Sequence, residues 1–129
     1  MKKLIALLFL CLPAMAYSQP TDCYKFREGR FRIEDTQAGV VTIAERRGGY
    51  QTESSESLKA VVRFRISWQD NCSYTLSLDK VIRNENKINF PSNLIITVKI
   101  LETNPDSYTQ EINSSLTNSS YRVKVTKLN

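Results

Sequence analysis

A stretch in the middle of the chain, residues 58–68, alternates apolar and polar side chains almost without interruption. Val61 apart, the residues between the apolar ones are polar or charged. The apolar members are Leu58, Ala60, Val62, Phe64, Ile66 and Trp68. A period of two places alternate side chains on one face of a strand, whereas a helix would scatter them around its circumference. The pattern therefore predicts a long β-strand with one buried face.

Shorter runs of the same alternation recur on both sides of this stretch. Turn-forming residues separate the runs, most clearly Gly48-Gly49 and Gln69-Asp70-Asn71. No segment has a convincing 3.6-residue period, and at most one helical turn fits within residues 53–59. We therefore predict an all-β protein of about eight antiparallel strands joined by short turns.

Eight consecutive antiparallel strands leave two edges, which a closed barrel or a β-sandwich protects. Sequential hairpins and one apolar face per strand favour a meander that closes into a small, lipocalin-like β-barrel. A β-sandwich is the alternative. The interior of a barrel of about eight strands is either filled by side chains or holds one small ligand.

The same periodicity predicts which side chains form the core. We expect one set to be buried: Phe31, Ile33, Leu58, Val62, Phe64, Ile66, Trp68, Tyr74, Leu76, Leu78, Leu94, Ile96, Val98, Ile112, Val123 and Val125. We expect their neighbours to be exposed: Arg32, Arg63, Arg65, Ser73, Thr75, Thr97, Lys99, Arg122 and Lys124.

The first sixteen residues have the composition of a secretory signal peptide. Lys2 and Lys3 precede an apolar run over residues 4–12, and Ala14-Met15-Ala16 has small residues where a signal peptidase cleaves. The run is far shorter than the roughly 20 residues that a membrane-spanning helix needs. We therefore predict export to the periplasm or the medium, no transmembrane segment, and a single domain over residues 17–129.

Two cysteines remain once Cys11 leaves with the signal peptide. In an oxidising compartment, Cys23 and Cys72 are expected to form a disulfide. Closing a loop of 49 positions contributes roughly 4 kcal/mol in chain-entropy terms. A redox-active pair is the alternative, but the Cys-x-x-Cys spacing that favours it is absent here.

The chain contains no histidine, which excludes His-dependent catalytic triads and imidazole metal ligands. Two carboxylate pairs remain as acid–base candidates, Glu34 with Asp35 and Glu53 with Glu56. Both lie in turn-like stretches, where we expect the charges to be solvated. We therefore predict a protein that is not an enzyme, with no catalytic residue, no metal and no cofactor.

Basic residues occupy alternate positions on the polar faces of three predicted strands. They are Arg30, Arg32, Arg63, Arg65, Arg122 and Lys124. Aligned strands would join them into a surface for an anionic partner, such as an anionic envelope component. The alternative is a solvated face that protects strand edges. A mature net charge of only +3, export and the lack of a nucleic-acid-binding motif argue against nucleic acid.

Two motifs carry a resemblance. Asp22-Cys23-x-x-Phe26-x-x-Gly29-x-Phe31 is followed mid-chain by Trp68-x-x-x-Cys72-x-Tyr74-x-Leu76. Together they resemble a group of small exported bacterial proteins with a lipocalin-like all-β domain and this cysteine pair. The resemblance covers most of residues 22–128. It implies the fold and the compartment, and it implies no activity.

Two functions of different classes follow from the sequence. The first is an exported binding module for a small ligand or an envelope component. The second is an interaction protein, such as an inhibitor of an extracellular hydrolase, that uses loops at one end of the barrel, for example residues 84–92. In the second case the partner is a protein.

Overall fold

Eight antiparallel strands are present in the computed structural model, which describes residues 22–129. They are β1 (Gly29–Asp35), β2 (Val40–Arg47), β3 (Tyr50–Ser55), β4 (Ala60–Trp68), β5 (Ser73–Asn84), β6 (Ile95–Thr103), β7 (Ser107–Ser114) and β8 (Ser120–Lys127). A single 3-10 turn, η1 (Tyr24–Phe26), precedes them. The predicted signal peptide, residues 1–16, lies outside the described residues.

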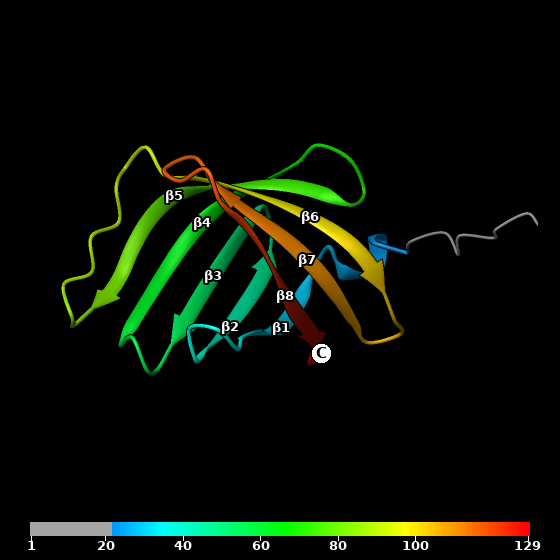
Figure 1. Ribbon diagram of the computed structural model, residues 1–129, viewed down its shortest axis with the longest axis horizontal. Helices are drawn as coiled ribbons and strands as arrows, with labels where there is room; N and C mark the ends of the chain where they lie inside the picture. The colour runs from blue at the N-terminus through cyan, green and yellow to red at the C-terminus, as the bar shows by residue number, and fades with distance from the viewer. Residues whose placement is uncertain (1–21) are drawn as a thin grey trace, which may run out of the picture.

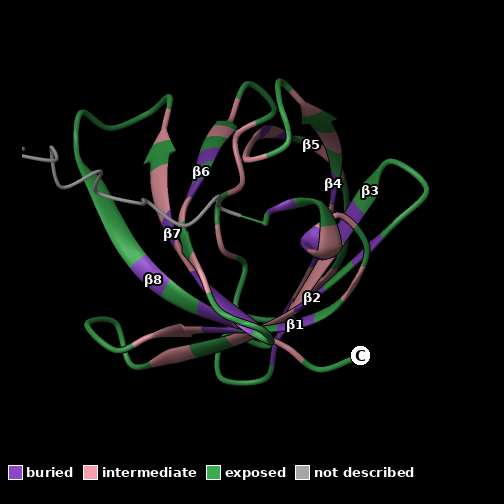
Figure 2. Ribbon diagram, turned by 90° about the vertical axis from the view of Figure 1, so that its right-hand side faces the viewer, coloured by how far each residue is buried: buried purple, intermediate pink, exposed green. Residues whose placement is uncertain are grey.

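The strands form a closed barrel in which each pairs with the next along the chain (Figure 1). β1 and β8 pair as well and close the ring, which Figure 2 shows from the η1 end. Two further backbone hydrogen bonds, Arg30 to Asn129 and Leu128 to Arg30, continue this seam. The predicted barrel is thus confirmed in preference to the sandwich.

Gly29 allows the C-terminal segment to approach β1. A Cβ atom on this glycine would lie 2.7 Å from the carbonyl oxygen of Asn129, closer than real Cβ contacts come. Its φ of 134° is also unfavourable for other residues. The seam between β1 and β8 therefore requires glycine at this position.

The turn between β2 and β3 fixes the register of these strands. Gly48 and Gly49 have φ values of 58° and 83°, the conformation of a two-residue type I′ hairpin. The turn pairs Arg47 with Tyr50 and therefore Arg46 with Gln51. Because paired residues share a face of the sheet, Arg46 and Gln51 both point into the barrel.

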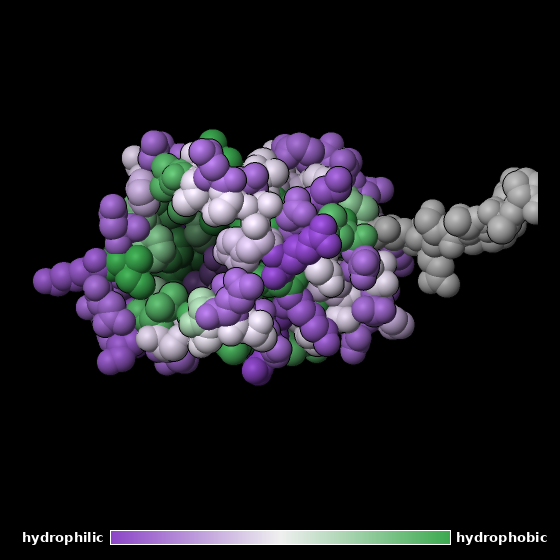
Figure 3. Space-filling model, in the orientation of Figure 1, coloured by the Kyte–Doolittle hydropathy of each residue, from purple (hydrophilic) through white to green (hydrophobic). Residues whose placement is uncertain are grey.

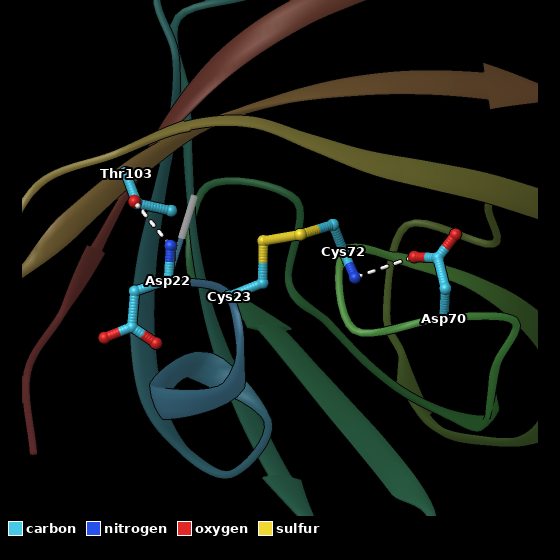
Figure 4. The surroundings of a disulfide bond; sticks show 5 residues. All are labelled: Asp22, Cys23, Asp70, Cys72 and Thr103. Carbon is cyan, nitrogen blue, oxygen red and sulfur yellow. Dashed lines mark hydrogen bonds between the residues drawn. A yellow bond between two sulfur atoms is a disulfide. The ribbon is translucent and has the colours of Figure 1, made fainter. Parts of the chain in front are cut away.

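A disulfide holds η1 across one end of the barrel. Cys23 and Cys72 are bonded as predicted, with their Cα atoms 5.2 Å apart. The Asp22 N–H donates to the Thr103 hydroxyl, and the Cys72 N–H donates to the Asp70 carboxylate (Figure 4). η1 thereby places the Phe26 ring, which has no exposed surface, in the apolar core.

Most of the predicted core is confirmed. The buried members are Phe31, Ile33, Val62, Phe64, Tyr74, Leu76, Val98, Val123 and Val125. Six others are half-buried and pack against these: Ile66, Trp68, Leu78, Leu94, Ile96 and Ile112. The prediction for Leu58 was wrong, because residues 56–59 form the turn between β3 and β4 and leave Leu58 39% exposed.

The predicted outer face is also largely confirmed. Arg32, Arg65, Thr97, Lys99, Arg122 and Lys124 are exposed. Arg63, Ser73 and Thr75 are half-buried instead. The Arg63 guanidinium lies 4.8 Å from the Tyr50 ring centre, which covers part of it. Ser73 and Thr75 lie on β5 between two paired strands, whose side chains partly cover them.

Candidate functional site

The barrel interior is filled at the η1 end and hollow at the opposite end. The hollow is a cavity of about 300 Å³, and Figure 3 shows hydrophobic residues inside it and along part of its rim. Its wall is formed by aliphatic side chains from at least five strands, among them Ile33, Leu76, Ile96, Val98, Ile112 and Val123. Leu58 also lines it from the β3–β4 turn, which explains why an apolar residue occupies that turn.

Arg46 lies inside the barrel, between the apolar end and the cavity. It is 2% exposed, and its guanidinium lies 4.3 Å from the Phe31 ring centre. Its Nε donates to the Gln51 side-chain oxygen at 2.6 Å, and Nη1 donates to the Phe26 carbonyl at 2.9 Å. A buried guanidinium costs several kcal/mol unless its donors are paired, and here η1 and β3 supply two acceptors.

Two tyrosines complete this buried network. Arg46 Nη2 donates to the hydroxyls of Tyr74 at 2.7 Å and of Tyr108 at 2.6 Å. Burial acts to lower the pKa of Arg46, but Tyr74, Tyr108 and the Glu53 charge together outweigh it and raise that pKa. Burial likewise raises the pKa of Tyr74 well above its usual value, so Tyr74 is neutral and Arg46 is charged at neutral pH. We call Phe26, Arg46, Gln51, Tyr74 and Tyr108 the Arg46 network.

The network continues toward the cavity through two residues. The Gln51 amide donates to Glu53 Oε1 at 3.0 Å, and the Tyr74 hydroxyl donates to Gln110 Oε1 at 3.4 Å. Gln51, Glu53, Tyr74 and Gln110 all line the cavity, whereas Arg46 does not. The cavity therefore has a polar floor beneath an apolar wall.

Glu53 is a half-buried carboxylate on this floor. Burial raises its pKa, although the Gln51 hydrogen bond and the Arg46 charge act to lower it. The expectation of a solvated turn was wrong for Glu53, which lies on β3 and points inward opposite Val62. Its predicted partner Glu56 does lie in a turn, with its side chain 93% exposed. The two carboxylates therefore do not form one site.

The raised pKa of the Glu53 carboxyl predicts how the stability of the protein depends on pH. The folded state then holds the Glu53 proton more tightly than the unfolded state, so stability is lost as pH rises above the usual value of 4.5 and through the folded pKa. Glu53→Gln keeps an oxygen for Gln51 and carries no charge. We expect this variant to melt at a higher temperature than the native protein at pH 7.5, with the difference shrinking toward pH 4. A lower melting temperature at pH 7.5 would contradict the assignment.

The other predicted carboxylate pair lies near the open end. Asp35 lines the cavity, and its Oδ1 accepts hydrogen bonds from the N–H groups of Gln37 and Ala38 in the β1–β2 turn. Glu34 pairs with Arg32 at 2.8 Å. Partial burial raises the pKa of Tyr121, and the charges of Asp35 and Glu53 act in the same direction. The carboxylates of Asp35 and Glu53 and the Tyr121 phenol therefore face the same cavity.

The predicted basic residues fall into two groups. Arg30 and Arg32 lie on β1, which pairs with the strand β8 that carries Arg122 and Lys124, whereas β2 and β3 separate Arg63 and Arg65 on β4 from them. Acidic neighbours pair with the arginines: Glu45, Glu34, Asp79 and Glu111. A hydrogen bond from Arg63 lowers the pKa of Asp79, and the Arg63 and Arg65 charges add to this. Positive and negative charges therefore alternate on the outer face, whereas one interpretation of the sequence was a continuous positive stripe.

Sequence reasoning missed Arg46, Gln51 and Gln110. In β2 the apolar residues Val41 and Ile43 point outward, so hydrophobicity alone suggests the wrong inner face. A usable signal was present in the Gly48-Gly49 turn. A two-residue hairpin fixes the pairing of Arg46 with Gln51. The two side chains of this pair can hydrogen-bond to each other, which is consistent with their sharing an inward face.

Neither a metal site nor a membrane-spanning helix is seen in residues 22–129. No three His, Cys, Asp or Glu residues there lie together as metal ligands would, and no helix there is long and apolar enough to cross a bilayer. No protein-family model, curated protein or solved structure matches the chain.

Proposed function

We propose that this chain is an exported, non-enzymatic binding module that holds one small ligand inside its barrel. The observation that carries the proposal is the cavity of about 300 Å³ with an apolar wall and a few polar groups on its floor. That combination is characteristic of small-molecule sites. At about 30 Å³ per water, the cavity corresponds to a ligand of roughly ten non-hydrogen atoms.

The geometry supports binding without a large rearrangement. The floor is held by the Arg46 network, and the wall belongs to strands that pair on both sides. A site built on rigid elements loses little conformational entropy when a ligand enters. The disulfide is compatible with an oxidising compartment and so supports export. The resemblance to small exported proteins and the alternative of a hydrolase inhibitor stay predictions.

A matched pair of variants tests the cavity. Thr42 on β2 lines it, and Thr97 on β6 is exposed on the outer face. We expect 2-naphthol, a small apolar fluorophore, to bind the native protein, and Thr42→Phe to weaken binding at least tenfold by filling the cavity. Thr97→Phe adds the same side chain outside and is expected to bind like the native protein.

Fluorescence titration of the three proteins gives the answer, and thermal melting confirms that each is folded. A folded native protein that does not bind 2-naphthol would contradict the proposal. Equal binding by Thr42→Phe and the native protein would also contradict it, because the probe would then occupy another place.

A further inference from the structure

We infer that the ligand is a small amphiphilic amine, whose ammonium group pairs with Glu53 while its apolar part contacts the cavity wall. This inference rests on the proposed function and specifies the ligand of the same cavity. It is carried by the charges that line the cavity, by the unused hydrogen-bonding capacity of Glu53, and by the engagement of Arg46 in four hydrogen bonds within the protein.

The charges that face the cavity have one sign. Its lining residues, all among those the structure describes, include the carboxylates Asp35 and Glu53 and no lysine or arginine. Both carboxylates act on Tyr121, which lines the same space. An anionic ligand would meet two like charges there, whereas a cation is attracted by both.

Glu53 has accepting capacity that the protein leaves unused. Within residues 22–129, Gln51 is its only hydrogen-bond donor, and it reaches one carboxylate oxygen. An ionised carboxylate offers about four acceptor positions over two oxygens. A ligand ammonium donates up to three hydrogen bonds, and charge-assisted bonds of this kind are among the stronger ones in proteins.

Arg46 is not available to an anionic ligand. Its Nε, Nη1 and Nη2 atoms already make four hydrogen bonds within the Arg46 network. Gln51 and Tyr74 line the cavity in front of it, and Arg46 itself does not reach the lining. A carboxylate or phosphate ligand would have to break this network to reach the guanidinium.

The cavity wall determines the chemistry of the part of the ligand beyond its ammonium group. Leu76, Ile96 and Ile112 present aliphatic surface to the same cavity, and Val62 is the cross-strand partner of Glu53. A hydrated metal ion or a polyamine would leave this surface in contact with water. A short alkyl or aryl chain would cover it, at a gain of roughly 25 cal/mol for each Å² of apolar area buried.

A series of eight-carbon compounds with different head groups tests the inference. Calorimetric titrations at pH 8 would compare n-octylamine, 1-octanol and octanoate. At that pH the ammonium is charged, since lysine-like amines have a pKa of about 10.4. We expect the affinity for octylamine to be at least about tenfold higher than for octanol, and the affinity for octanoate to be the lowest of the three.

Glu53→Gln should remove the advantage of the amine over the alcohol. Glu45→Gln is the matched control, because Glu45 lies on the outer face with its side chain 67% exposed. It should keep the native preference for the amine. Octanol or octanoate binding as tightly as octylamine would overturn the inference. So would an amine preference that survives Glu53→Gln.

The two proposals can fail separately. If 2-naphthol binds in the cavity but octylamine has no advantage, the binding function stands and the amine assignment is wrong. If neither 2-naphthol nor any octyl compound binds to the folded protein, both are wrong.

Discussion

Replacing Arg46 with methionine is expected to lower the free energy of unfolding by about 3–5 kcal/mol. Methionine fits the space by length but leaves the Phe26 carbonyl, the Gln51 oxygen and two tyrosine hydroxyls without their donor. Each unpaired buried polar group costs roughly 1–3 kcal/mol. Since small domains are stable by only about 5–15 kcal/mol, this single change removes a large share of the total.

Urea denaturation followed by Trp68 fluorescence measures the effect of Arg46→Met. Arg65→Met is the control, because the Arg65 side chain is 68% exposed and its pairing with Asp79 on the surface is expected to contribute less than about 1 kcal/mol. Arg46→Lys keeps the charge but not the planar fork of donors, and it should also be destabilised. A loss below about 1 kcal/mol for Arg46→Met would show that the network is not important for stability.

Replacing Cys72 with serine is expected to lower the free energy of unfolding by about 4 kcal/mol, given the 49-residue separation of the bonded cysteines. The unfolded chain gains freedom, and η1 loses its covalent tether over the barrel end. The position of Phe26, whose carbonyl accepts a hydrogen bond from Arg46 and whose ring packs in the core, then depends on non-covalent contacts alone.

Reductant provides the internal control for this prediction. Added to the native protein, it should lower the urea midpoint toward that of Cys72→Ser, and it should leave the midpoint of the variant unchanged. Mass spectrometry of the unreduced exported protein reports the bond directly. Two free thiols in that material, or a native midpoint insensitive to reductant, would contradict the role given to the disulfide.

The strands and the barrel could be predicted from sequence because a period of two leaves little choice. In β4, Val62, Phe64 and Ile66 point inward as the alternation requires, and a slip of one residue would bury Arg63 and Arg65. Pairing each strand with its neighbour in sequence then leads to closure. Periodicity, short turns and the edge problem all favour the same architecture.

The candidate site could not be predicted in the same way, because its residues break the pattern that identifies the fold. Arg46 and Glu53 are charged residues on inward faces, and Val41 and Ile43 are apolar residues on an outward one. Local hydrophobicity cannot show that four acceptors, from η1, β3, β5 and β7, will surround one guanidinium. That arrangement arises only when the barrel is assembled.

The up-and-down order of the strands places different kinds of connection at the two ends of the barrel, and this difference affects how the sequence can diverge. The connections at residues 36–39, 56–59, 85–94 and 115–119 all lie at the open end, whereas η1, the disulfide and the Gly48-Gly49 turn lie at the other. Surface connections tolerate insertion and substitution far better than packed or covalently tied segments. A lineage can therefore reshape the cavity mouth, and with it ligand selectivity, while the folded scaffold beneath is inherited unchanged.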